Sequence, residues 1–427
     1  MFNLPTLLLQ IGVILVAARL TGRLFRLIHQ PQVIGEMVAG ILLGPSLFGW
    51  LAPKLSALVF PPESLGYLNA LSQIGLIVFM FLVGLELSPK ELRGRGHLAF
   101  LTSHASIFAP FILGMLLALY LYPRLSDDSI SFTHFSLFLG VAMSITAFPV
   151  LARILSERWL LNTRLGSIAI TTAAVDDVTG WSILAVLVVL VRSTEAGASL
   201  WLTFISVGLY VLAMVFLVRQ QLKRIEALYI SKGMITQNIL ALVLLLVLVS
   251  AWISEWLGIH AFFGAFLVGA IMPKQEKFVQ TLYEKLNDIA VVLLLPLFFA
   301  LTGLRASIAL LAGLEMWFYF ALILIVAVGG KLGGTALAAR YGGMSWREAA
   351  SLGILMNTRG LVELVLLNIG LDIGVISPAL FTMMVLMALV TTFMTAPLFE
   401  WVYYARALPK KYASATQSAE ETPGDIL

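Results

Sequence analysis

Two adjacent aspartates, Asp176 and Asp177, lie in an apolar segment over residues 168–190 that holds no other charged residue. The segment is long enough to cross a bilayer as a helix. A carboxylate at membrane depth costs about 2.5–3.5 kcal/mol on insertion scales, and such residues usually serve ion binding or proton transfer. Two in succession therefore predict a site at which a cation meets carboxylates.

A lysine inside another apolar segment is the natural counter-charge for this pair. Lys331 lies well within residues 312–339, and an unpaired ammonium there would be costly to bury. Successive residues of a helix point about 100° apart, so one aspartate can face Lys331 while the other faces a different element. Either Asp176 or Asp177 is a suitable partner for the lysine.

Two further apolar segments contain interruptions of the helical pattern. In residues 133–155, Pro149 lacks an N–H group and leaves carbonyls near Ser144 and Thr146 without helical partners. In residues 347–370, the interruption consists of Asn357, Thr358, Arg359 and a glycine. Interrupted helices at corresponding positions of two halves are typical of a transport site, so we expect the two breaks to form such a site, which one of the aspartates faces.

These groups suit competition between a proton and a hard monovalent cation. A carboxylate surrounded by hydroxyl and carbonyl oxygens binds an alkali cation, and out of water it can take up a proton when the cation leaves. Arg359 supplies a fixed positive charge beside one break. Glu36 and Glu363 could line the approach from the cytoplasm, or they could instead pair with Arg359. No arrangement for hydrolysis, phosphate binding or nucleophilic catalysis is evident, so we expect neither an enzyme nor a cofactor.

Composition sets the fold class. Of the 427 residues, 60% are hydrophobic and 12% are charged, against about 25% charged in soluble domains. The chain has no cysteine, and its basic residues are scattered rather than gathered as in nucleic-acid-binding proteins. We predict an all-α polytopic membrane protein with about 13 transmembrane helices, at residues 4–24, 33–50, 66–87, 98–121, 133–155, 163–191, 200–219, 235–256, 259–273, 287–304, 312–339, 347–370 and 376–405.

The connections between these segments predict the orientation. Lys and Arg are concentrated in alternate connections, whereas the others hold only Lys54, Arg124, Arg192 and Arg305. Because basic loops remain in the cytoplasm, the N-terminus is expected outside and the C-terminus inside.

The two halves share short patterns. Residues 79–85 and 298–304 both read F-x-x-L-x-G-L, and they are followed by Glu86 and Arg305. Residues 40–45 and 264–273 are both glycine-rich and end in proline. We predict one transmembrane domain over 1–411, made of inverted repeats at about 1–192 and 235–411 with a linker helix at about 200–219. Residues 412–427 are expected to form a short disordered cytoplasmic tail.

As a set, these stretches resemble the monovalent cation:proton antiporter-2 family, which includes bacterial sodium/proton exchangers and plant cation/proton exchangers. The resemblance is carried by residues 31–45, 79–87, 146–155, 171–180, 262–273, 295–305 and 357–364.

The resemblance implies a homodimer in the plasma or inner membrane, acting in pH homeostasis, whose core domain moves like an elevator against a dimerisation domain. It also implies that Asp177 carries the cation or proton, that Asp176 pairs with Lys331, and that the two broken helices cross near Thr146 and Thr358 to form the site. In the family the Asp-Asp form is associated with Na⁺, whereas residues 357–364 look like the K⁺-type branch. We therefore expect exchange of Na⁺, with K⁺ as the alternative. A channel-like K⁺ efflux protein and a sodium-coupled organic-anion symporter are the other candidates.

Overall fold

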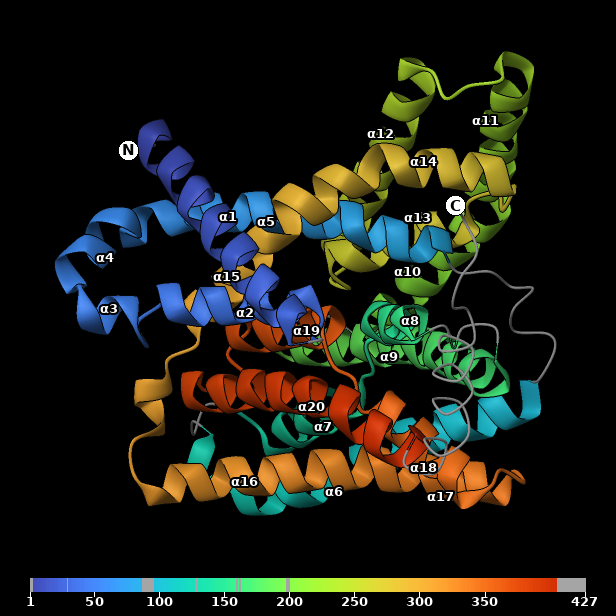
Figure 1. The fold of residues 1–427 in the computed structure, drawn as a ribbon. Coiled ribbons are helices and arrows are strands. Elements are labelled where there is room, and N and C mark those ends of the chain that lie inside the picture. Colours follow the sequence, from blue (N-terminus) through green and yellow to red (C-terminus); the bar gives the residue numbers. More distant parts are fainter. Residues whose placement is uncertain are drawn as a thin grey trace, which may run out of the picture.

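The chain folds into a bundle of helices (Figure 1). The structure is a computed structural model, and it describes residues 3–28, 30–86, 96–126, 130–158, 160, 163–196 and 200–404. The helices of the first half are α1 (Leu4–Leu27), α2 (Gln32–Leu43), α3 (Phe48–Leu51), α4 (Pro53–Val59), α5 (Pro62–Glu86), α6 (Gly96–Leu125), α7 (Phe132–Ser144), α8 (Phe148–Glu157) and α9 (Arg164–Ala196). Those that follow are α10 (Leu200–Ala213), η2 (Met214–Val218), α11 (Arg219–Lys232), α12 (Gln237–Trp256), α13 (Ala261–Ile271), α14 (Glu276–Asp288), η3 (Ile289–Leu294), α15 (Leu295–Arg305), η4 (Ile308–Leu311), α16 (Leu314–Val328), η5 (Gly329–Gly333), α17 (Gly334–Tyr341), α18 (Trp346–Met356), α19 (Leu361–Asp372) and α20 (Pro378–Tyr404).

The predicted class, an all-helical polytopic membrane protein, is confirmed. Within the described ranges, 10 helical segments are long and apolar enough to cross a membrane. The pair α18 and α19, bent by 44° at its break, brings the number to 11. The helices α7 and α13 are apolar but shorter. The predicted tail, residues 412–427, lies outside the described residues.

Several predicted boundaries differ from the structure. The linker helix predicted over 200–219 continues through η2 and α11 to Lys232, and the helix predicted over 287–304 begins at Glu276. Both extensions are rich in charged residues, so hydropathy alone does not include them although the backbone remains helical. The segment predicted over 33–50 is divided into α2 and α3, at a connection that contains Gly44 and Pro45.

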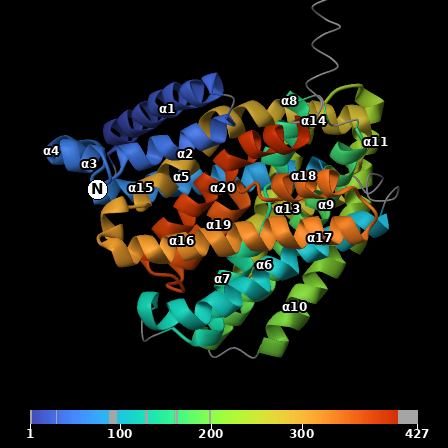
Figure 2. The ribbon, with the colours of Figure 1, turned by 60° about the horizontal axis from the view of Figure 1, so that its bottom comes forward.

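The helices pack as two groups, which views from two directions show side by side (Figure 2). The scaffold group is formed by α1, α2, α5, α12, α13, α14 and α15. The core group is formed by α6, α7, α8, α9, α16, α17, α18, α19 and α20. The chain passes from the core group to the scaffold group through α10 and α11.

Glycines allow two very close helix crossings inside the scaffold group. A Cβ atom at Gly40 of α2 would lie 2.5 Å from the carbonyl oxygen of Ala300 in α15, so no larger residue fits there. A Cβ atom at Gly269 of α13 would overlap the carbonyl of Phe81 in α5. The crossings are reciprocal: α2 packs on α15, and α13 packs on α5. Each half of the chain thus supplies one helix to each crossing.

Candidate transport site

The first interruption lies between α7 and α8. Residues Ile145 and Ala147 are extended, and α8 starts at Phe148 with Pro149 in its first turn. Proline is well tolerated there, because the first N–H groups of a helix have no partner within the helix. Pro149 therefore begins a new helix instead of bending a continuous one.

The second interruption lies between α18 and α19 and crosses the first. The N–H group of Ala147 donates to the carbonyl oxygen of Thr358 at 2.9 Å, which joins the two extended segments. Thr392 of α20 holds the second segment from behind: it accepts from the Arg359 N–H at 2.9 Å and donates to the Arg359 carbonyl at 2.7 Å. The structure therefore brings the two predicted helix breaks together.

Arg359 compensates the end of α7. Its guanidinium donates to the carbonyl oxygens of Ala142 (2.8 Å) and Met143 (2.7 Å), which have lost their helical partners. Glu363, one turn further along α19, lies 3.1 Å from the same guanidinium, and both side chains are fully buried. The positive charge thus meets the negative end of the α7 dipole and one carboxylate.

Lys331, in η5, forms the centre of a second buried network. Its Nζ donates to Asp176 Oδ2 at 3.1 Å, to Thr146 Oγ1 at 2.5 Å and to Ser106 Oγ at 2.9 Å. The Thr146 hydroxyl donates to Asp176 Oδ2 at 2.7 Å. Lysine, threonine and aspartate belong to three different parts of the chain, so this network ties η5 and the first break to α9.

Two serines of α6 complete the hydrogen bonding of Asp176. Ser103 donates to Oδ1 at 2.5 Å and Ser106 donates to Oδ2 at 3.0 Å. Sequence reasoning missed both residues. The available signal was their spacing of three in an apolar segment, which places both hydroxyls on one face of a helix. With these donors, every oxygen of Asp176 is paired.

Asp177 is buried beside the crossing, and its hydrogen bonding differs from that of Asp176. Only 2% of its surface is exposed, and within the described part of the chain neither carboxylate oxygen has a hydrogen-bond donor. The backbone N–H of Phe148, at the start of α8, is directed toward this carboxylate but does not meet the geometry of a hydrogen bond. A buried carboxylate with two unused oxygens is costly to keep charged, which is the condition for binding a cation or a proton.

The other predicted residues of the crossing divide into two kinds. The Ser144 hydroxyl donates to Val141 O at 2.8 Å and the Thr358 hydroxyl to Leu355 O at 3.0 Å, so both serve their own helices. Asn357 Oδ1 is buried and, within the described residues, accepts no hydrogen bond. It is a further oxygen available for a ligand, beside the two of Asp177.

A cavity of about 360 Å³ reaches the crossing from one end of the molecule. It lies between the two groups of helices, with Glu36 of α2 and Tyr283 of α14 on one wall and Ala147 of the first break and Leu361 of α19 on the other. Gln32 donates to Glu36 Oε1 at 2.9 Å, which fixes this carboxylate at the cavity wall. Of the two glutamates expected along an approach, Glu36 thus lines the cavity and Glu363 is buried against Arg359.

The multi-pass fold and a buried carboxylate at two crossing helix breaks define a secondary membrane transporter. The sodium/hydrogen exchanger transmembrane family matches residues 12–401. The chain belongs to this family, whose members exchange a monovalent cation for protons and are not enzymes.

Individual relatives are named as antiporters of a monovalent cation and protons, in agreement with this family. The chain is 45% identical to the Na⁺/H⁺ antiporter NhaS4 of Synechocystis, over 95% of this chain and 99% of that protein. It is 43% identical to cation/H⁺ antiporter 17 of Arabidopsis thaliana and 33% identical to K⁺/H⁺ antiporter 1 of Saccharomyces cerevisiae, covering 98% and 99% of this chain. In these two the match spans about half of the relative, 51% and 48%. The sodium/proton antiporter MjNhaP1 of Methanocaldococcus jannaschii has a similar fold, with a TM-score of 0.64, 15% identity and coverage of 95% and 99%.

Proposed function

We propose that this protein exchanges Na⁺ for protons across a membrane by alternating access, with Asp177 as the residue that carries the cation or the proton. The observation that carries the proposal is the contrast between the two aspartates. Asp176 is held by Lys331, Thr146 and two serines, whereas Asp177 is buried without a donor among the described residues.

Competition for Asp177 accounts for the exchange. When Na⁺ binds, the carboxylate is charged and is compensated by the cation, with Asn357 Oδ1 as a further oxygen at the crossing. When Na⁺ leaves, burial favours the neutral carboxyl, so a proton takes its place. The site therefore crosses the membrane loaded with one ion or the other, and coupling needs no separate gate for each ion.

Lys331 has a positioning role in this scheme. Its ammonium compensates Asp176, which otherwise would be a second buried negative charge next to Asp177. Arg359 performs the corresponding role for Glu363 and for the carbonyls that end α7. The negative charge of Asp177 is then left for the transported ion.

The two packing groups support an elevator-like movement. The crossing and both aspartates belong to the core group, and the cavity lies between this group and the scaffold group. We infer thirteen spans, because α7 with α8, and α13, can be added as two short spans to the eleven that are long enough to cross a membrane. The reciprocal α2–α15 and α13–α5 crossings support the inverted repeats. The homodimer and the outward N-terminus follow from the family resemblance and from the basic loops.

The ions for which the relatives are named bear on which cation this protein transports. NhaS4 is named for Na⁺, whereas the yeast relative is named for K⁺. NhaS4 has the greater identity to this chain and is matched over nearly its whole length, so Na⁺ is favoured and K⁺ is the second candidate.

Reconstitution in proteoliposomes tests the proposal. An imposed pH gradient, followed with a ΔpH-sensitive dye, should collapse on addition of Na⁺ for the wild-type chain and for Glu226→Gln, a conservative change in α11 away from the crossing. Asp177→Asn should show no cation-dependent dequenching, and full retained exchange in this variant would overturn the assignment. The series Na⁺, K⁺ and Li⁺, repeated with the membrane voltage clamped by an ionophore, gives selectivity and electrogenicity.

The same preparation separates the rival functions. A channel would pass the cation without a proton gradient and at rates above carrier turnover. A sodium-coupled anion symporter would accumulate an anionic substrate and would not respond to the pH gradient.

A further inference from the structure

The interface between the two groups of helices is open at one end and bonded at the other. At the open end lies the cavity bounded by Glu36 and Tyr283, on the side whose connections carry the concentrated Lys and Arg residues. By the rule for basic loops this is the cytoplasmic side. The bonded end lies at the C-termini of α15 and α19, on the outer side.

Arg305, the last residue of α15, crosses the interface at the bonded end. Its Nη1 donates to Asn368 Oδ1 at 3.0 Å and to Asp372 Oδ1 at 2.9 Å, both in α19. The Asn368 amide also donates to Thr302 Oγ1 of α15 at 2.9 Å. Three hydrogen bonds thus join a scaffold helix to the helix that begins at the second break.

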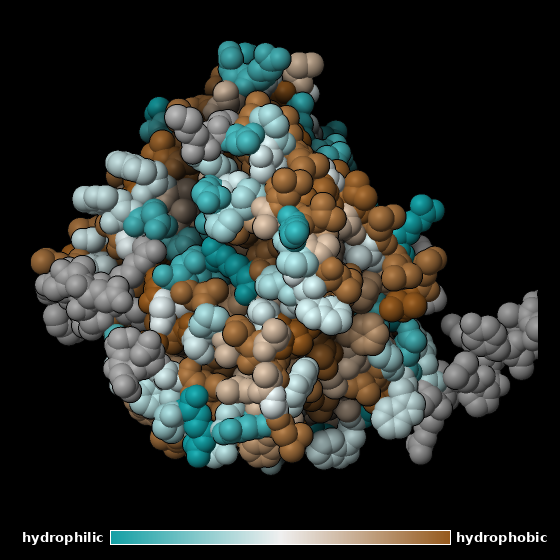
Figure 3. Space-filling model, turned by 90° about the vertical axis from the view of Figure 1, so that its left-hand side faces the viewer, coloured by the Kyte–Doolittle hydropathy of each residue, from teal (hydrophilic) through white to brown (hydrophobic). Residues whose placement is uncertain are grey.

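These bonds lie where the interface meets solvent. The Asp372 carboxylate is 48% exposed and Arg305 is 27% exposed, whereas Asn368 is buried beneath them. Hydrophilic residues gather near the middle of the face that carries α3 and α4 (Figure 3). A half-exposed ion pair is weak enough to be broken in each cycle, and the buried amide gives it a fixed geometry.

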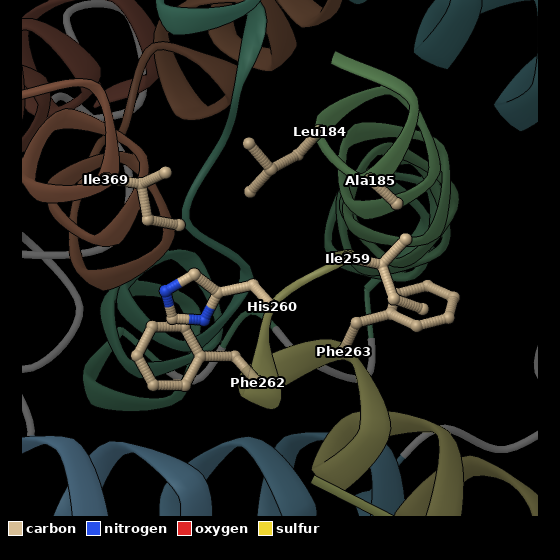
Figure 4. Close-up of a pocket in the computed structure, with 7 residues that line it drawn as sticks. All are labelled: Leu184, Ala185, Ile259, His260, Phe262, Phe263 and Ile369. Carbon is tan, nitrogen blue, oxygen red and sulfur yellow. The ribbon is translucent and has the colours of Figure 1, made fainter. Parts of the chain in front are cut away.

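A second contact at the outer half of the interface is apolar. His260, directly before α13, and Phe262 and Phe263 of α13 lie against Leu184 of α9 and Ile369 of α19, leaving a cavity of only about 10 Å³ (Figure 4). The rings of His260 and Phe262 lie side by side, with centroids 4.2 Å apart. A space of this size admits about one water molecule, so no ion pathway is open here.

The repeat pattern provides a counterpart to Arg305 at the cytoplasmic side. Arg305 and Glu86 follow the same F-x-x-L-x-G-L motif, at the ends of α15 and α5. In this conformation Glu86 is hydrogen-bonded to Tyr283, within the scaffold group. Across the cavity from Phe79 of α5 lies Val150 of α8, the helix that begins at the first break.

The charges at the ends of these helices are complementary in both repeats. Arg305 faces Asp372, the last residue of α19, and the two have opposite charges. At the other end Glu86 is negative, and Arg158, directly after the end of α8, is positive. Arg158 now pairs with Glu400 of α20 at 2.8 Å. The helix ends of the two repeats thus carry opposite charges with the signs exchanged, and in this conformation only Arg305 and Asp372 are in contact.

We propose that Arg305 and Glu86 are alternating latches of the transport cycle. Arg305 closes the outer side by binding Asn368 and Asp372 in the present conformation, and Glu86 closes the cytoplasmic side by binding Arg158 when the core group moves. Each latch forms as the other is released, so the site is never open to the outer side and to the cytoplasmic side at the same time. The proposal rests on the proposed antiport function and orientation.

Thiol labelling tests the outer latch, because the chain has no cysteine and a single introduced one reports alone. Val33→Cys places a thiol on the cavity wall. Combined with Arg305→Ala, its rate of reaction with a hydrophilic maleimide should fall by about threefold or more, because the population with an open cytoplasmic cavity decreases. The exposed Lys223→Cys in α11 should react at the same rate with and without Arg305→Ala.

The charge-exchanged pair Arg305→Asp with Asp372→Arg keeps the outer latch in reversed form. It should restore most of the Val33→Cys labelling rate, which a variant that merely unfolds would not do. Equal Val33→Cys labelling in the presence and absence of Arg305→Ala would overturn the outer latch. Labelling reports conformation whether or not ions are exchanged, so this failure is distinct from failure of the antiport proposal.

Thiol cross-linking tests the cytoplasmic latch. A glutamate–arginine pair spans more than a disulfide can bridge, so Glu86→Cys with Arg158→Cys should be joined by a bifunctional maleimide of about the length of that pair, and the yield should rise when Arg305→Ala is added. Glu86→Cys with Asp372→Cys is the control, since these positions lie at opposite ends of the interface and should not react. Failure of the first pair to cross-link in both backgrounds would overturn the role of Glu86.

Discussion

Asp176 and Asp177 are neighbours in α9, yet their carboxylates have opposite hydrogen-bonding environments. Asp176 accepts hydrogen bonds from Ser103, Ser106, Thr146 and Lys331. Asp177 has no donor among the described residues and lies beside the two crossed helix breaks. The difference arises from the 100° rotation between successive helical residues, which directs one side chain toward α6 and η5 and the other toward the crossing.

Removing the charge of Lys331 should destabilise the core group strongly. Lys331→Met leaves Asp176 as a buried charge without its cation, and breaking a buried pair on one side costs about 3–5 kcal/mol. The double variant with Asp176→Asn should recover much of this loss, because it removes the unpaired charge as well. Unfolding of the purified protein in detergent measures both; a double variant as unstable as the sum of the two single changes would contradict the pairing.

The close crossing of α2 on α15 should not tolerate a side chain. At Gly303 a Cβ atom would overlap the backbone of Gly40 and Ile41, so Gly303→Ala should lower stability by about 1–3 kcal/mol. Gly12→Ala in α1 is the matched control, since no atom lies within 4 Å of its Cβ position. The control should be neutral or stabilising by up to about 1 kcal/mol, through better helix propensity. Equal melting temperatures for the two variants would contradict the crossing.

Lys274, in the connection after α13, should make stability depend on pH. Its ammonium donates to the carbonyls of Gly84, Leu85 and Gly269, and burial lowers the pKa of Lys274 from 10.5 to about 8. The unfolded chain keeps this proton up to pH 10.5 whereas the folded chain releases it near pH 8, so folding gains stability as the pH rises between these values.

An arginine at this position remains charged throughout the range. The melting temperature of the wild type relative to Lys274→Arg should therefore increase from pH 7.5 to pH 10. A difference that stays constant over this range would show that Lys274 does not titrate there.

Glu36 should raise the local concentration of cations at the cytoplasmic opening. Its carboxylate lies on the cavity wall and is oriented by Gln32, so Glu36→Gln should increase the apparent KM for the cation added on that side by about threefold at low ionic strength. The increase should become smaller at high salt, because salt screens the attraction between this carboxylate and a cation that approaches through solvent. Glu284→Gln, on an exposed part of α14, should leave the KM unchanged.

The amino-acid sequence by itself determined the class of protein and the identity of the chemically important residues. Long apolar segments require a helical membrane protein, because only helices satisfy their own backbone groups in lipid. A charged side chain inside such a segment is costly to bury and is therefore expected to have a function. On this ground Asp176, Asp177, Lys331 and Arg359 could be selected without coordinates. Proline and glycine marked the two interruptions in the same way, through backbone groups that no helix can pair.

Only the tertiary structure decided which group each residue meets. The sequence left both aspartates as possible partners of Lys331, and it gave no reason to connect Ser103 and Ser106 with Asp176. It suggested Glu36 and Glu363 equally for the approach, whereas the fold places one on the cavity wall and the other against Arg359. The physical reason is that hydropathy and helical periodicity act along one segment. Pairing across the bundle depends on how helices distant in the chain rotate and cross, and here that rotation is fixed by the close glycine contacts and by the buried charges themselves.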